Sequence, residues 1–211
     1  MKVLIIGATG SVGKHLVQQS LAQGHEVTAL TRSPENADFG ISENPGNLKV
    51  FKGDVLDPPS IDEAFKGQDA VLVTLGAGLK GKVRSQGTQN VINAMKKHGV
   101  DRLVCQTTLG VGESNANLNF KWKYIMFGGL LRAAFKDHVM QENHVKTSKL
   151  NWTIVRPSAF TDNEFTGNYK HGFGSEEQGL SLSISRADVA HFMTSQIANL
   201  EYVRQTPGVS N

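Results

Sequence analysis

The residues best suited to binding chemistry form a glycine-rich stretch near the N-terminus, Gly7-Ala8-Thr9-Gly10-Ser11-Val12-Gly13. It follows an apolar run typical of a buried strand and precedes apolar residues at helical spacing, the context in which such a loop binds a dinucleotide. Gly7 permits a sharp turn, Gly10 lets a pyrophosphate approach the backbone, and Gly13 lets the helix pack against the strand. The helix N-terminus then offers free N–H groups to the phosphates. The spacing is G-x-x-G-x-x-G rather than G-x-G-x-x-G, so the first turn is one residue longer, and we predict a nucleotide site rather than a purely structural turn.

The residues after the second apolar run select the type of dinucleotide. An NAD-binding protein places Asp or Glu there to bind the ribose 2′-hydroxyl, whereas this chain has Leu30-Thr31-Arg32-Ser33. The planar guanidinium of Arg32 suits a 2′-phosphate, and Thr9 and Ser33 add hydroxyl donors. The alternative is a solvated surface arginine. Given the glycine loop, the sequence favours NADP(H) over NAD(H).

Three further groups follow predicted strands. Asp54 can accept a hydrogen bond from an adenine amino group while Val55 packs on the ring, or Asp54 caps a turn. Leu75-Gly76-Ala77-Gly78 lets the backbone approach a ribose, or forms an ordinary turn. The hydroxyls of Thr107 and Thr108 point near a nicotinamide, or bond to the local backbone.

The rest of the chain supplies the elements that position these residues. Apolar runs alternate with helical patterns along nearly the whole length. Strands are predicted at 2–6, 26–31, 47–51, 70–75, 102–106 and 152–155, and helices at 12–23, 57–65, 82–97, 138–148 and 186–199, the last with Ser185 as its N-cap. This order indicates an α/β fold: a doubly wound parallel sheet with helices on both faces, in which ligands bind at the carboxyl ends of the strands.

One segment interrupts the alternation. Residues 110–135 are rich in aromatic side chains and follow the fifth strand, so they can cover the ligand crevice. The prediction is one domain spanning residues 1–211, with a lid or insert at about 110–135. An equally open alternative is a surface segment that packs its own aromatic residues.

Composition excludes several classes of protein. The chain has 211 residues and a net charge of +3. Its pI is 9.0, but its cations are spread out, so we expect no nucleic-acid partner. The single cysteine, Cys105, forms no disulfide and is expected in the core. The N-terminal apolar run is too short for a signal-peptide core and no apolar stretch reaches 18 residues, so we expect a cytoplasmic protein without a membrane partner. We also expect a monomer or a weak homo-oligomer.

The chain resembles the atypical short-chain dehydrogenase/reductases, and within them the flavin reductase (NADPH)/biliverdin-IXβ reductase group. Besides the glycine loop and Thr31-Arg32-Ser33, the resemblance rests on these runs: Gly53-Asp54-Val55-Leu56, Gly67-Gln68-Asp69-Ala70-Val71, Asn93-Ala94-Met95-Lys96-Lys97-His98-Gly99-Val100-Asp101 and Ser183-Ile184-Ser185-Arg186-Ala187-Asp188. It covers the chain from Lys2 to about Ile197 and is looser in 110–135.

The resemblance implies a Rossmann-fold, NADPH-dependent reductase that passes hydride to flavins and, in some members, to linear tetrapyrroles. The positions it assigns to the cofactor are Gly7, Thr9, Gly10, Ser11, Val12, Arg32, Asp54, Val55, Leu75 and Gly76, and we add Gly13, Ser33, Thr107, Pro157 and Phe160 as further candidates. His138, in an Asp-His pair, matches a histidine near the nicotinamide ribose. Without the resemblance, His138 reads as a solvated histidine at a helix start.

Departures from the family bear on catalysis. The serine after the fifth strand is Thr108 here, and a histidine after the sixth strand is Ala159, which cannot titrate. The Tyr-x-x-x-Lys pair of typical short-chain dehydrogenases is absent, because Gly128 stands four residues after Tyr124. Hydride transfer to a flavin needs mainly stacked, oriented rings, so we expect Thr108 and His138 to assist. Trp122, Phe127, Ser158 and Ala159 are expected to surround a planar acceptor.

Two readings from other classes of protein stay open. One is a non-catalytic NADP(H) sensor resembling the NmrA-like regulators. The other is a scaffold or assembly protein whose aromatic segment is an interaction surface. Fold resemblance cannot choose between them, because function depends on the site.

Overall fold

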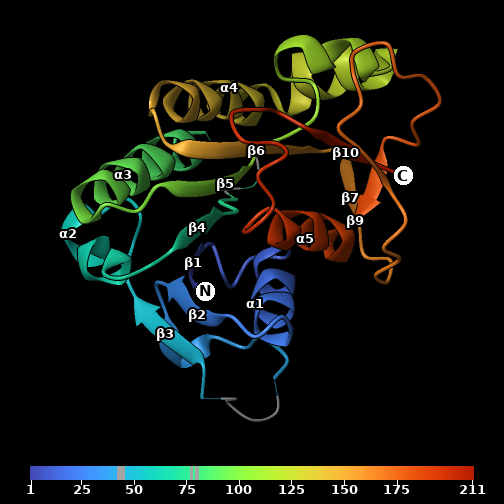
Figure 1. Cartoon of the computed structure of the whole chain (residues 1–211). Helices are drawn as coiled ribbons and strands as arrows, with labels where there is room; N and C mark the ends of the chain where they lie inside the picture. The colour runs from blue at the N-terminus through green and yellow to red at the C-terminus, as the bar shows by residue number, and fades with distance from the viewer. Residues whose placement is uncertain (42–45, 77, 79–80) are drawn as a thin grey trace.

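The computed structural model of the chain describes residues 1–41, 46–76, 78 and 81–211. Ala77, which belongs to one of the predicted strand-end turns, lies outside the described residues. The N-terminal strands and helices form one part of the large sheet and its cover, and later segments extend that sheet and add a small second one (Figure 1).

An eight-stranded sheet in the order β3-β2-β1-β4-β5-β6-β10-β8 forms the centre of the fold. All its neighbouring pairs are parallel except β10 with β8. The strands are β1 (Lys2–Ile6), β2 (Glu26–Thr31), β3 (Leu48–Lys52), β4 (Ala70–Val73), β5 (Arg102–Gln106), β6 (Asn151–Pro157), β8 (Lys170–His171) and β10 (Gly208–Ser210). A second, two-stranded sheet pairs β7 (Ala159–Thr161) with β9 (Ser183–Ser185) in parallel.

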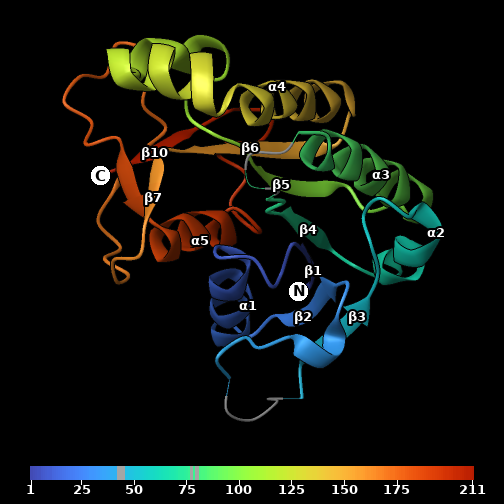
Figure 2. The same cartoon turned by 180° about the vertical axis from the view of Figure 1, so that it is seen from behind.

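Helices cover both faces of the large sheet (Figures 1 and 2). The helices α2 (Pro58–Ile61), α3 (Val83–His98) and α4 (Arg132–Thr147) lie on one face, and α1 (Gly13–Ala22) and α5 (Arg186–Ser195) on the other. Alternate residues of β1 enter two separate hydrophobic clusters. Leu4 and Ile6 pack with α3, and Val3 and Ile5 pack with α1 and α5. This two-sided burial confirms the doubly wound α/β fold, because a strand covered on both faces is apolar at every position.

The boundaries differ from prediction where tertiary packing decides them. The fourth helix begins at Arg132 rather than His138, and the last ends at Ser195 rather than Asn199. The predicted helix 57–65 divides into α2 and the 3₁₀-helix Asp62–Phe65. Strands β7 to β10 were not predicted, because two- and three-residue strands carry no periodic pattern and form only by pairing with distant chain.

The segment 110–135 contains two irregular helices. The 3₁₀-helix Gly112–Asn117 is followed by the π-helix Lys121–Leu130, which leads directly into α4. The amide of Leu131 donates to the carbonyl of Met126, five residues earlier, at 2.7 Å. π-helices are rare and frequently lie at functional sites.

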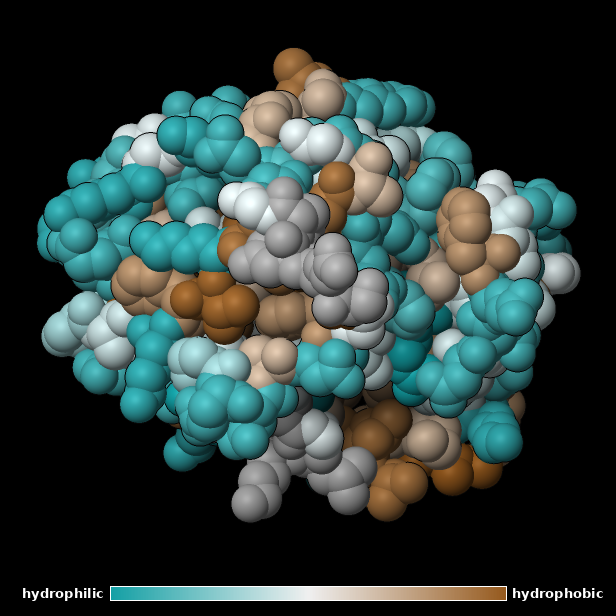
Figure 3. Space-filling model, turned by 90° about the horizontal axis from the view of Figure 1, so that it is seen from below, coloured by the Kyte–Doolittle hydropathy of each residue, from teal (hydrophilic) through white to brown (hydrophobic). Residues whose placement is uncertain are grey.

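The face of the molecule seen from below is mostly hydrophilic (Figure 3). Seen from below, hydrophilic atoms dominate and hydrophobic atoms form separate groups (Figure 3). Within the described part of the chain, no helix has the length and apolar content that crossing a bilayer requires. Cys105 is fully buried in β5, as expected.

Candidate functional site

Close backbone contacts explain the glycines of the N-terminal loop. Gly7 has φ +84°, and a Cβ there would lie 2.6 Å from the carbonyl oxygen of Thr74. A Cβ on Gly13 would lie 2.1 Å from the carbonyl oxygen of Gly7. The amide of Gly10 donates to that same oxygen at 2.9 Å, closing the turn. The loop therefore keeps its backbone exposed to a ligand and allows α1 to begin directly against β1.

A groove of about 480 Å³ lies over this loop, at the carboxyl ends of β1 to β4. We call it the glycine-loop groove. Ten of the predicted cofactor residues line it: Gly7, Thr9, Gly10, Ser11, Val12, Arg32, Asp54, Val55, Leu75 and Gly76. Phe160 lines it as well. The groove has the place and the exposed backbone that a dinucleotide requires.

Four of the expected cofactor residues lie outside the lining of the groove: Gly13, Ser33, Thr107 and Pro157. Gly13 packs under the loop instead. Ser33 follows Arg32, and its amide donates to the hydroxyl of Thr31 at 3.3 Å. Asp54 lines the groove and also accepts from the amide of Leu56 at 2.9 Å, so it takes part in a turn as well.

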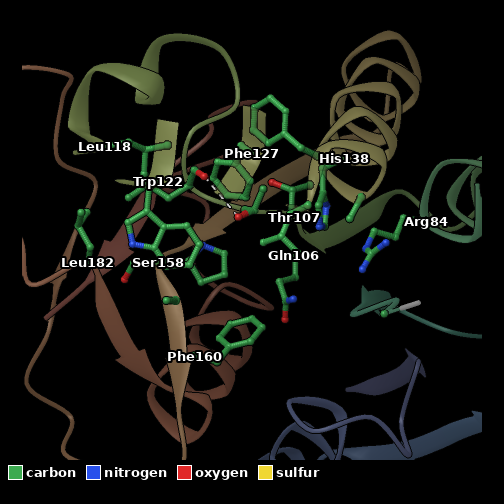
Figure 4. Close-up of a pocket in the computed structure, with 18 of the residues that line it drawn as sticks. Arg84, Gln106, Thr107, Leu118, Trp122, Phe127, His138, Ser158, Phe160 and Leu182 are labelled. Carbon is green, nitrogen blue, oxygen red and sulfur yellow. Dashed lines mark hydrogen bonds between the residues drawn. The ribbon is translucent and has the colours of Figure 1, made fainter. Parts of the chain in front are cut away.

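A second cavity, of about 430 Å³, adjoins the groove, and we call it the aromatic pocket. Every predicted acceptor-site and catalytic residue lines it: Trp122, Phe127, Ser158, Ala159, Thr108 and His138. Five predicted cofactor residues line it as well: Leu75, Gly76, Thr107, Pro157 and Phe160. The rings of Phe127 and Phe135 stack with centroids 4.6 Å apart, and Trp122 lies 5.6 Å from Phe127. Figure 4 shows Trp122 on one side of this pocket and His138 on the other.

The groove and the pocket share a wall made by Leu75, Gly76, Gln106 and Phe160. The two cavities are therefore neighbours along these four residues. Sequence reasoning missed Gln106, although its place at the end of β5 is a signal that could have found it.

Gln106 has an unusual environment. It is 7% exposed, and its Oε1 has no hydrogen-bond partner among the described residues. Figure 4 shows its amide directed away from Thr107, toward the side where Phe160 lies. A buried polar atom without a partner is costly in a folded protein, so this oxygen is suited to a ligand that crosses the shared wall.

His138 lies on α4, and its Nδ1 is 3.0 Å from Oε1 of Gln141. Burial, with a smaller contribution from the positive charge of Arg84, lowers the pKa of His138 to about 4. The imidazole is therefore neutral at pH 7. It can form hydrogen bonds to a ligand, but it does not carry a proton ready for donation.

A buried ionic cluster lies behind the pocket. Arg156 on β6 is fully buried, and its Nε and Nη2 donate to the two carboxylate oxygens of Glu142 at 2.8 and 2.7 Å. Lys146 and the hydroxyl of Thr107 each donate to Glu142 at 2.9 Å. Although burial raises it, these bonds hold the pKa of Glu142 below its usual range. The hydroxyl of Thr107 is thus used by the cluster, while that of Thr108 donates to the Leu109 carbonyl at 3.3 Å.

A second ion pair joins α3 to α4 beside the pocket. Asp137 accepts from the amides of Arg84 and Ser85 at 3.0 and 3.1 Å. The Arg84 guanidinium lies 3.7 Å from Asp137 and lines the aromatic pocket. This arrangement places an ion pair beside the aromatic pocket, and sequence reasoning missed it because Arg84 carries no local motif.

Comparison with known proteins agrees with this geometry. Residues 7–200 match the model of a family described as NAD(P)H-binding. The yeast UPF0659 protein YMR090W is 28% identical over 205 residues, covering 93% of this chain and 87% of that protein. A chloroplastic Arabidopsis thaliana protein, At2g34460, is 30% identical over 79% of this chain, which spans only 62% of that protein.

One solved structure is of particular interest. ChuY, an anaerobillin reductase from Escherichia coli O157:H7, superimposes with a TM-score of 0.78 at 25% identity, covering 99% of this chain and 96% of ChuY. These comparisons confirm the resemblance to the atypical short-chain dehydrogenase/reductases.

Proposed function

Because the chain belongs to the NAD(P)H-binding family that its residues 7–200 match, we propose that it is an NADPH-dependent reductase whose acceptor is a planar flavin or linear tetrapyrrole. The observation that carries the proposal is the wall shared by the glycine-loop groove and the aromatic pocket. It would allow a nicotinamide in the groove to face an acceptor in the pocket, and a hydride transfer requires that contact.

The groove fits a dinucleotide. The absence of side chains at Gly7 and Gly13 lets the loop pack tightly on Thr74 and on its own backbone, which supports the conformation in which the loop lines the groove. The N-terminus of α1 offers N–H groups and a partial positive charge to the pyrophosphate. We assign the adenine to Asp54 and Val55, and the nicotinamide end to the shared wall.

Arg32 supports NADPH rather than NADH. It lines the groove at the end of β2, is exposed, and follows a strand that ends without an acidic residue. A guanidinium binds a phosphate through two parallel hydrogen bonds. We assign it to the ribose 2′-phosphate.

The lining of the pocket supports a flat acceptor. Trp122, Phe127 and Phe160 offer aromatic faces. Arg84 and Arg186 also line the pocket, each in an ion pair with an aspartate, Asp137 and Asp162. We propose that residues 110–135 act as a lid, since Trp122 and Phe127 cover one side of the pocket.

The residues of this chain serve mainly to orient the reactants. NADPH, when bound, supplies the hydride. The acceptor then needs one proton, which we assign to water entering the pocket, because His138 is neutral and Ala159 cannot titrate. Thr108 lines the pocket, and we assign its hydroxyl to holding the acceptor or the nicotinamide amide.

The test is NADPH oxidation, followed at 340 nm with FMN, FAD and biliverdin in turn, and NADH as the alternative donor. The proposal predicts acceptor-dependent oxidation that prefers NADPH. Arg32→Ala should lower kcat/KM for NADPH about tenfold or more and leave NADH unaffected, since a charge-assisted hydrogen bond contributes about 1.5–3 kcal/mol. Lys96→Ala, an exposed cation of α3 that lines neither cavity, is the matched control.

Other outcomes would point elsewhere. NADPH binding in calorimetry without reduction of any acceptor would favour a non-catalytic sensor or scaffold. This alternative deserves a test because neither His138, which is neutral, nor Ala159 can donate a proton as an acid in the pocket. Thr108→Val should slow turnover with FMN, and unchanged kinetics would remove its assigned role.

A further inference from the structure

The π-helix Lys121–Leu130 and the residue before it carry an exposed apolar surface. Phe120, Tyr124, Ile125 and Leu130 are 70, 65, 56 and 65% exposed. We call these four residues the outer face. In both cartoon views this yellow-green helical segment lies at the upper edge of the molecule, away from the centre of the sheet (Figures 1 and 2).

The opposite side of the same segment is already in use. Trp122, Phe127 and Leu131 line the aromatic pocket, and Phe127 stacks on Phe135 of α4. The segment therefore has two apolar sides, of which only one is buried by its own chain. Packing against the pocket accounts for the inner side and leaves the outer face unexplained.

Between Glu113 and Asp137, which are ion-paired with Arg156 and Arg84, the chain carries charge of a single sign. Residues 114–136 contain four cations and no Asp or Glu: Lys121, Lys123, Arg132 and Lys136. None of these four takes part in an ion pair within the described ranges of the chain. The partner that complements this surface is anionic and accepts apolar side chains.

We propose that the outer face docks on an anionic lipid bilayer, with the segment lying in the interfacial plane. A polar face rich in Lys and Arg beside exposed Phe, Leu and aromatic residues is the composition of interfacial helices. A second copy of the chain would bring four more cations against these four. A nucleic acid would leave Ile125 and Leu130 exposed to water.

The proposal revises the expectation of no membrane partner. That expectation rested on the absence of a long apolar stretch, which excludes crossing a bilayer core of about 30 Å but not lying on its surface. The ten residues of the π-helix are far too few to cross. Because the inner side of the segment lines the aromatic pocket, docking would place that pocket beside the bilayer.

The experiment is co-sedimentation of the full chain with vesicles of phosphatidylcholine, alone or mixed with phosphatidylglycerol. Binding should require the anionic lipid and weaken at high salt. Lys121→Gln/Lys123→Gln should lower the partition coefficient roughly thirtyfold, at about fivefold per charge. Ile125→Ser/Leu130→Ser should lower it roughly tenfold.

The controls use exposed positions elsewhere. Leu200→Ser removes an equally exposed leucine, and Lys66→Gln/Lys96→Gln removes two exposed cations outside this segment. Both should bind vesicles like the parent chain. NADPH binding and circular dichroism identify any variant that has not folded.

Four results would overturn the proposal, and three of them concern vesicles and self-association. These are equal binding to neutral and anionic vesicles, no binding to either, and self-association that Ile125→Ser/Leu130→Ser abolishes without vesicle binding. Equal or tighter binding to a single-stranded oligonucleotide would replace the bilayer with nucleic acid. Vesicle binding does not depend on turnover, so NADPH oxidation with FMN in the absence of vesicles tests the proposed reductase separately.

Discussion

Replacing Gln106 by leucine should raise stability and impair turnover together. The side chain is 7% exposed and its Oε1 lacks a partner in the described structure. Leucine has a similar size and no polar atom. A buried oxygen without a hydrogen bond costs about 1–3 kcal/mol, and Gln106→Leu removes that cost from the ligand-free protein.

The size of the effect follows from the length of the chain. For a domain of about 150–250 residues, each kcal/mol shifts Tm by about 2–4 °C. Differential scanning calorimetry of the ligand-free protein should therefore show a Tm about 2–12 °C higher in Gln106→Leu.

The effect on function has the opposite sign. Gln106 lines both the glycine-loop groove and the aromatic pocket, so its amide is available to the nicotinamide amide or to the acceptor. Losing one such hydrogen bond should lower kcat/KM for NADPH oxidation about tenfold, which is about 1.4 kcal/mol.

A matched control exists outside both cavities. Gln196 is 2% exposed and its Oε1 also lacks a partner among the described residues. Its Nε2 donates to Ser195 at 3.0 Å. Gln196→Leu should leave NADPH oxidation unchanged. The reasoning about Gln106 is refuted if Gln106→Leu lowers Tm, or if it raises Tm and leaves kcat/KM at the wild-type value.

Three further predictions test the site. Arg156→Met leaves the buried Glu142 without the guanidinium of Arg156, and urea denaturation should show a free energy of unfolding about 3–5 kcal/mol lower. The double variant Arg156→Met/Glu142→Leu should recover most of that loss. A double variant no more stable than Arg156→Met would contradict this. Burial lowers the pKa of His138 to about 4, so the pH profile of kcat for NADPH oxidation should show no inflection near pH 6.5 that depends on His138; an inflection that disappears in His138→Phe would contradict this. The free energy of unfolding should fall as the pH drops from 6.5 toward 4, because in that range only the unfolded imidazole binds a proton. Gly13→Ala places a Cβ 2.1 Å from the carbonyl oxygen of Gly7 and should abolish NADPH binding in calorimetry. Wild-type affinity in this variant would contradict the importance of the tight turn.

The sequence by itself determined the fold class, the existence of six major strands and the exact bounds of three of them. β1, β2 and β5 have their predicted bounds, and Ser185 caps α5 by accepting from the amide of Asp188. These features are local. Apolar runs, turn glycines and capping hydroxyls act through neighbours in the chain, so their patterns are legible without a structure.

Only the tertiary structure decided how the cofactor and acceptor candidates divide between two cavities and which side chains join them. The position of Gln106 at the end of β5 could have been noticed in the sequence, but the missing partner of its Oε1 could not, because it depends on the residues packed around the side chain. The bonds from Thr107 and Arg156 to Glu142 join β5, β6 and α4. The low pKa of His138 depends on burial and on Arg84, 54 residues earlier in the chain. Burial and electrostatic pairing depend on contacts between residues that are distant in sequence, and no local pattern encodes them.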